Sequence, residues 1–132
     1  MVNLDLAKSY FLRCKIRFEV LPNYLDKEDY ADVIRESQEI IELMQKGLLI
    51  SVGIQPPKWH DVTKIILENE QLFTKDIILK ITELKNDIVW LRGQRELSFY
   101  GDMDFIPEES YIKEDALKAI KCVESIINLI KN

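Results

Sequence analysis

Arginine, glutamate, tyrosine and aspartate occur together in the segment WLRGQRELSFYGD, which spans residues 90–102. The guanidinium group of arginine binds phosphates and carboxylates through paired hydrogen bonds, because its donors lie in one plane. Carboxylates accept such bonds, and a tyrosine hydroxyl both donates and accepts. We therefore treat this segment as a candidate ligand- or partner-binding site, made of Arg92, Arg95, Glu96, Tyr100 and Asp102.

The residues before this segment predict a long helix that begins after a Thr74 cap and carries Arg95 on its apolar face. Its apolar positions step by four and three, and Arg95 is the next position in that rhythm, with Arg92 beside it. A buried charge is costly unless it is paired. We therefore expect Arg95 to be mostly buried against Glu96, Glu36 or an acidic partner, or to face an interfacial cleft. The apolar positions are Ile77, Ile81, Leu84, Ile88 and Leu91.

Several roles stay open for these residues. Arg95 could form a structural ion pair or dimer contact, bind a ligand without catalysis, or take part in phosphoryl chemistry. Tyr100 fits a residue at the edge of the core better than a catalyst, because a phenol with a reference pKa near 10 is a poor base at neutral pH. The only histidine, His60, lies in a second motif with Lys58 and Asp61, where capping and packing compete with a functional role.

Composition limits the class of protein. The chain has 132 residues, of which 47% are hydrophobic and 31% charged, and its net charge is −5. This acidic balance argues against a broad electrostatic surface for nucleic acid, although a local basic pocket stays compatible with it. Two cysteines without a C-x-x-C pattern fit buried, reduced thiols, and no apolar run is long enough to cross a membrane. We expect one cytoplasmic domain over residues 1–132, with neither a metal site nor a cofactor.

The apolar periodicity predicts helices throughout and no strands. We expect a first helix over residues 4–21, ended by Pro22, and a second that starts after an Asp26 cap. A short helix over 61–68 and the long helix after Thr74 follow, and the last helix covers about 113–130. The predicted fold is all-α, an up-and-down helical bundle of four longer helices plus one short helix. Surplus apolar residues on the last two helices, together with Trp59 and Trp90, favour a homodimer.

The stretch YADVIRESQEIIELMQKGLLISVGIQPPKWHDV, residues 30–62, resembles the second helix and following loop of HEPN domain proteins. RELSFYGD and YIKEDALKAI are similar to the closing half of that family, so the resemblance covers nearly the whole chain. The positions that carry it in the first stretch are Tyr30, Ala31, Arg35, Glu36, Glu42, Leu43, Lys46, Leu48, Leu49, Gly53, Ile54, Pro57, Lys58, His60 and Asp61.

This resemblance implies a five-helix prokaryotic domain that commonly dimerises. Many members of the family look like metal-independent ribonucleases paired with a minimal nucleotidyltransferase as toxin and antitoxin, and others bind nucleotides, RNA or proteins without catalysis. The ribonuclease signature is an arginine followed, after about four to six residues, by a histidine. Here Tyr100, Gly101 and Asp102 occupy those positions after Arg95.

The departure from the signature favours a non-catalytic, homodimeric module that binds a nucleotide or a partner protein. That partner would be a minimal nucleotidyltransferase in a toxin–antitoxin-like system. The alternative is a metal-independent HEPN ribonuclease acting on RNA, with Arg95 and Tyr100 as its weak catalytic candidates and His60 supplied from elsewhere in the dimer.

Overall fold

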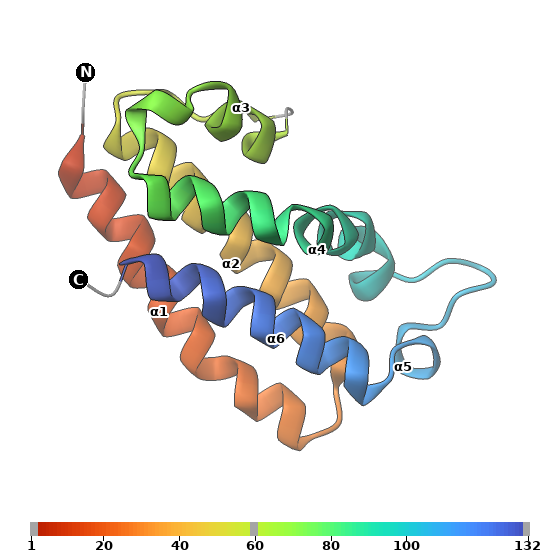
Figure 1. Ribbon diagram of the computed structural model, residues 1–132. Helices are drawn as coiled ribbons and strands as arrows, with labels where there is room; N and C mark the ends of the chain where they lie inside the picture. The colour runs from red at the N-terminus through yellow and green to blue at the C-terminus, as the bar shows by residue number, and fades with distance from the viewer. Residues whose placement is uncertain (1–2, 59–60, 131–132) are drawn as a thin grey trace.

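The computed structural model describes residues 3–58 and 61–130. Across these two ranges the chain forms α-helices and two single 3₁₀ turns, with no β-strand (Figure 1). This confirms the predicted all-α helical bundle. The helices are α1 (Leu4–Asp26), α2 (Tyr30–Ser51), α3 (Val62–Glu68), α4 (Lys75–Phe99), α5 (Pro107–Ser110) and α6 (Lys113–Ile127), with 3₁₀ turns η1 (Glu70–Leu72) and η2 (Asn128–Ile130).

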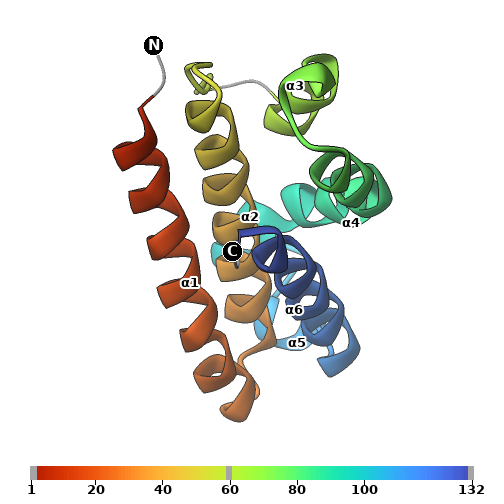
Figure 2. The same ribbon diagram turned by 60° about the vertical axis from the view of Figure 1, so that its left-hand side comes forward.

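Helix α2 lies at the centre of the bundle. Figure 2 shows α1 along one side of it and α4 and α6 along the other, and α3 also packs against it. Fourteen of its 22 residues are buried, which explains why apolar residues occur on nearly every face of its sequence. The core therefore forms around α2. Its largest fully buried side chains include Ile34, Ile40, Ile41, Met44 and Leu49.

Helix α1 continues past Pro22, so the prediction that proline ends it was wrong. A proline inside a helix removes one backbone hydrogen bond and crowds the preceding turn. The apolar pattern nevertheless goes on, because Leu21 is fully buried and Tyr24 and Leu25 are partly buried. We infer that packing of this last turn offsets the lost hydrogen bond.

Helix α2 begins later than predicted. Its N-cap is Asp29, whose carboxylate accepts a hydrogen bond from the backbone N–H of Asp32 at 3.2 Å. The predicted cap, Asp26, instead forms the last turn of α1. Asp61, predicted as the first residue of the short helix over 61–68, is instead the N-cap of α3 and accepts from the N–H of Lys64 at 3.3 Å. The short helix α5 was not predicted, because its four residues carry no apolar periodicity.

The end of α1 is closed by two backbone hydrogen bonds that wrap around Glu28. The N–H of Glu28 donates to the carbonyl of Leu25 at 3.0 Å, and the N–H of Asp29 donates to that of Tyr24 at 2.9 Å. This is the Schellman pattern, which places the residue after the cap in the left-handed region. Glu28 has a φ of 59°, in the left-handed region, where residues other than glycine are strained.

The end of α2 has the same Schellman pattern, with glycine in the left-handed position. Gly53 has a φ of 85° and donates to the carbonyl of Ile50 at 3.0 Å. The N–H of Ile54 donates to the carbonyl of Leu49 at 2.9 Å. The two helix ends therefore form a matched pair, glycine in one and glutamate in the other.

We expect Glu28→Gly to raise the free energy of unfolding by about 0.5–1 kcal/mol. Relief of the left-handed strain at this position should exceed the added flexibility of glycine in the unfolded chain. Gly53→Ala should lower the free energy of unfolding by about 1 kcal/mol, because it introduces the strain that glycine avoids. Urea unfolding followed by circular dichroism measures both, and Glu28→Gln controls for the removed charge. A destabilised Glu28→Gly variant would contradict the assignment.

Candidate functional site at the end of helix α4

Arg95 lies at the edge of the bundle rather than in its core. Its side chain is 51% exposed, so the prediction that it is mostly buried was wrong. The prediction that Arg95 pairs with carboxylates is confirmed, but its partners differ from those expected. They are Glu39 and Glu42 of α2, whereas Glu36 pairs elsewhere, and the structure does not describe the side chain of Glu96.

The exposure of Arg95 follows from helix geometry. A straight α-helix has 3.6 residues per turn, so an apolar seven-residue repeat drifts by about 20° per heptad. Along α4 the buried positions run from Ile81 and Ile88 to Leu91 and Ser98. The drift carries the buried face toward Ser98, whose hydroxyl donates to the carbonyl of Arg95 at 3.1 Å. Arg95 is left beside this face, at the seam with α2.

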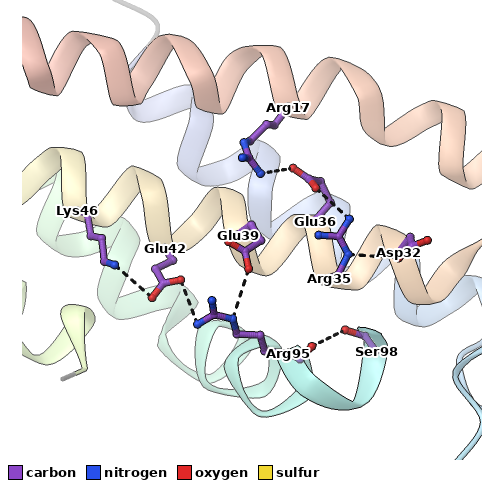
Figure 3. Close-up of polar contacts among 9 residues, drawn as sticks. All are labelled: Arg17, Asp32, Arg35, Glu36, Glu39, Glu42, Lys46, Arg95 and Ser98. Carbon is purple, nitrogen blue, oxygen red and sulfur yellow. Dashed lines mark hydrogen bonds and ion pairs between the residues drawn. The ribbon is translucent and has the colours of Figure 1, made fainter. Parts of the chain in front are cut away.

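The guanidinium group of Arg95 bridges two carboxylates across the seam between α4 and α2 (Figure 3). Its Nε lies 3.4 Å from Oε1 of Glu39, and its Nη1 lies 3.5 Å from Oε2 of Glu42. The other oxygen of Glu42 faces Nζ of Lys46 at 3.6 Å, at the i,i+4 spacing at which side chains on a helix meet. Because Arg95 is exposed and its partners are only half-buried at the edge of the bundle, we expect each pair to contribute about 1 kcal/mol to stability.

Arg92 makes a second link, to the residue that caps α3. Its Nη1 lies 3.2 Å from Oδ2 of Asp61. Two of the three residues in the predicted loop motif are thus placed: Asp61 beside Arg92, and Lys58 on the surface. The third, His60, lies outside the described residues. The structure therefore brings part of the loop motif to the same place as the arginines of α4.

A small cavity of about 60 Å³ lies beneath the two arginines, walled by α2, α3 and α4. Thr63 donates to Oε1 of Gln45 at 2.6 Å on one wall. Gln38 lines another wall and is only 5% exposed, and its Oε1 has no hydrogen-bond partner in the part of the chain that the structure describes. A buried acceptor without a donor is costly. Gln38 is therefore a buried polar side chain next to the arginine site whose Oε1 is closed off from solvent.

The segment after α4 is a pinned loop that carries Tyr100 and Asp102. Tyr100 is 79% exposed, which places it on the surface rather than at the edge of the core. Gly101 has a φ of +73°, and a Cβ there would lie 2.6 Å from the carbonyl oxygen of Phe105. Asp102 and Phe105 exchange two backbone hydrogen bonds, of 2.9 and 3.1 Å. The loop thus holds Tyr100 on the surface, next to a fixed turn.

Polar links continue along α2 beyond the arginine site. Oε1 of Glu36 lies 2.9 Å from Nη1 of Arg17 in α1, and its Oε2 lies 3.4 Å from Nη2 of Arg35. Arg35 also reaches Asp32 at 3.3 Å (Figure 3). The carboxylate of Glu36 is largely buried, so this cluster braces α1 against α2 and is the more structural of the two networks.

The two cysteine thiols are buried and unreactive. Burial raises the pKa of the Cys14 and Cys122 thiols to about 12, so both stay protonated at neutral pH. Both thiols are free and buried, as predicted.

Within residues 3–58 and 61–130, no group of three or more histidine, cysteine, aspartate or glutamate side chains could hold a metal ion. No helix in that part of the chain is long and apolar enough to cross a membrane.

An acidic cluster surrounds the N-cap of α2. Burial raises the pKa of Asp29 to about 6, helped by its contact with Asp32 and by the charge of Glu108 in α5. An aspartate whose pKa is higher in the folded state binds its proton more tightly there than in the unfolded chain. Its ionisation therefore removes stability as the pH rises from about 4 to about 6.

We expect Asp29→Asn to weaken this loss of stability. Asparagine is as good an N-cap as aspartate but carries no charge, so the cap stays while the repulsion goes. The melting temperature of the variant, relative to the parent, should be higher at pH 7 than at pH 4. Asp104→Asn, an exposed residue with the same charge change, is the control. Parallel melting curves for Asp29→Asn and the parent across this range would contradict the assignment.

Comparison with known proteins agrees with this architecture. A family model of the HEPN domain matches residues 7–132, and the chain therefore belongs to the HEPN domain family. It is also 28% identical over 141 residues to a protein of Methanocaldococcus jannaschii named "Putative toxin MJ1304", a match that covers 98% of this chain and 89% of that protein. No solved structure matches the chain.

Sequence reasoning found the arginines but missed most of their surroundings. Glu39, Glu42 and Gln38 were not predicted to lie at the arginine site. The available signal was the row of polar residues at spacings of three and four along a helix that is otherwise apolar. Such a row in a central helix indicates the seam between two neighbouring helices.

Proposed function

We propose that this HEPN protein is a non-catalytic, homodimeric binding module and the toxin-like half of a two-component pair. The end of α4, with Arg92 and Arg95, is the surface that it offers to its ligand or partner protein. We place the pair in the cytoplasm, where its two free thiols stay reduced.

The observation that carries the non-catalytic assignment is the occupation of both arginines by carboxylates. Arg95 bridges Glu39 and Glu42, and Arg92 meets Asp61, so each guanidinium group is already paired with a carboxylate of the chain itself. Cleavage of RNA through the ribose 2′-hydroxyl also needs a group that accepts its proton near neutral pH. Tyr100, which stands at the family's histidine position, suits that task poorly.

The two-component assignment rests on the family and on its archaeal relative, whose name contains the word toxin. A toxin is kept by a cell together with something that neutralises it, and the HEPN resemblance suggests a minimal nucleotidyltransferase for that role. A nucleotidyltransferase encoded beside this chain would support the pairing, and an isolated gene would weaken it. The bound ligand in this proposal is a nucleotide or a surface of the partner protein.

One observation favours the alternative, a metal-independent ribonuclease. Asp61, which contacts Arg92, directly follows His60 in the chain. The only histidine of the protein thus belongs to the same motif as a residue at the arginine site. In that alternative His60, rather than Tyr100, would accept the proton.

We expect no cleavage of single-stranded RNA above background in the absence of metal. General acid–base groups contribute about 10²- to 10⁴-fold each, so a site without one should be nearly inactive. The assay compares the parent with Arg95→Ala and His60→Ala. Cleavage that disappears in either variant would establish the ribonuclease. Tyr100→His, which restores the family spacing, then shows whether the missing histidine alone limits the site.

Exposed apolar side chains on α4 and α6 support the homodimer. Val89 of α4 and Leu117 of α6 are 55% and 45% exposed, and Leu79 of α4 is also exposed. Nearby, Nζ of Lys118 lies 4.2 Å from the ring centre of the partly buried Trp90. Apolar surface of this extent on a small acidic protein is reason to expect a second copy.

Sedimentation equilibrium at micromolar concentration should give about twice the chain mass of 15.5 kDa. Val89→Glu and Leu117→Glu should shift the equilibrium to monomers, because they bury a charge in the proposed interface. Leu12→Glu and Ile16→Glu serve as controls, since both positions are exposed on the outer face of α1. Dissociation by the α1 variants alone would move the interface to that face, and a monomeric parent would remove it.

A further inference from the structure

We propose that Glu39 and Glu42 act as an electrostatic guard, which keeps polyanions such as RNA away from Arg95. The site then selects a protein surface that carries both positive and negative side chains. This inference rests on the proposed binding function of the α4 end and names the kind of partner that the site accepts.

The first support is the charge of the site itself. Its cations are Arg92, Arg95 and Lys46, and each of them lies within 3.6 Å of a carboxylate oxygen. The carboxylates are Asp61, Glu39 and Glu42, so three positive and three negative formal charges cancel. A polyanion that approaches Arg95 meets two carboxylates at the same guanidinium group.

This balance matters because affinity for nucleic acid comes largely from cations that replace the counterions of phosphates. An arginine already neutralised by protein carboxylates releases few counterions when a phosphate arrives. The net charge of −5 adds a repulsive background. Arg95 therefore contributes little to RNA binding as long as Glu39 and Glu42 hold it.

The second support is the kind of group that the exposed side of the site presents. The side chains of Asp61, Glu39 and Glu42 are 38%, 30% and 24% exposed, so a partner can reach them. Their oxygens are hydrogen-bond acceptors, and a phosphate brings acceptors only. A lysine, arginine or amide side chain of a partner protein brings donors that these carboxylates can accept.

The exposure of the pairs points to recognition rather than stability. Arg95 and its two carboxylates are exposed enough that their ion pairs add little to folding. A partner can take over both halves of the bridge, with its cation on Glu39 or Glu42 and its carboxylate on Arg95. Such an exchange fixes the register of a complex and rejects surfaces of a single sign of charge.

The test measures binding of a labelled oligouridylate by fluorescence anisotropy at two salt concentrations. Wild-type protein should bind weakly and with little salt dependence. Glu39→Gln/Glu42→Gln should bind about tenfold more tightly, because the cations that these carboxylates hold become available to phosphates. The slope of log K against log salt should steepen by about 0.7 for each additional phosphate that the variant neutralises. Adding Arg95→Gln to the double variant should remove most of the tighter binding, and the rest comes from Lys46, which has also lost Glu42.

A matched control separates the guard from total charge. Glu68→Gln/Glu83→Gln makes the same change in net charge by removing exposed carboxylates that pair with Lys64 and Lys80. This control should bind the RNA no better than wild type. Equally tight binding by the control, no tighter binding by the guard variant, or wild-type binding as tight as that of the guard variant would each overturn the proposal.

Circular dichroism melting accompanies every variant. If the double guard variant fails to fold, the single variant Glu39→Gln takes its place, because Glu42 then keeps both Lys46 and part of its contact with Arg95. The single variant should bind the RNA more tightly than wild type by a smaller factor, and unchanged affinity counts against the guard. The binding assay is independent of cleavage, so wild-type RNA cleavage would refute the non-catalytic function and leave this comparison readable.

Discussion

When a helix packs against neighbours on nearly every side, its charged residues can lie only at the seams between those neighbours. Helix α2 is in this position, with α1 on one side and α4 and α6 on the other. Its carboxylates therefore meet cations that come from other helices: Glu36 meets Arg17 of α1, and Glu39 and Glu42 meet Arg95 of α4. The burial of one helix thus decides where the charges of three helices lie.

The two seams have different consequences because their depth differs. Between α1 and α2, Glu36 is largely buried and pairs at 2.9 Å, so losing its partner would leave a charge in a poorly solvated place. Between α2 and α4 the carboxylates are half-buried, Arg95 is exposed, and the distances are longer. The first seam therefore braces α1 against α2, and in our proposal the second exchanges its partners when a protein binds. A binding surface is more easily built on the second.

The sequence predicted the helices well, because apolar residues at spacings of three and four identify a buried face whatever it packs against. It failed where a tertiary contact decided the outcome. Pro22 did not end α1, since buried residues beyond it continued the packing, and Asp26 lost the role of cap to Asp29. Arg95 followed the apolar rhythm of α4 but left the core as the buried face drifted toward Ser98. Its pairing with Glu39 and Glu42 depends on how two helices are aligned, which no local pattern specifies.

The bridge from Arg95 to Glu39 and Glu42 has an evolutionary consequence. Tyrosine and histidine codons differ by one base, so a histidine at position 100 is a single mutation away. After such a mutation alone, Arg95 would still be neutralised by Glu39 and Glu42, which lie more than fifty positions earlier in the chain. Both carboxylates would have to change as well, and neither change would bring a benefit before the histidine was present. Under the proposed function, the intermediate variants between the binding module and a nuclease would have no advantage. Selection would therefore keep the protein as a binding module.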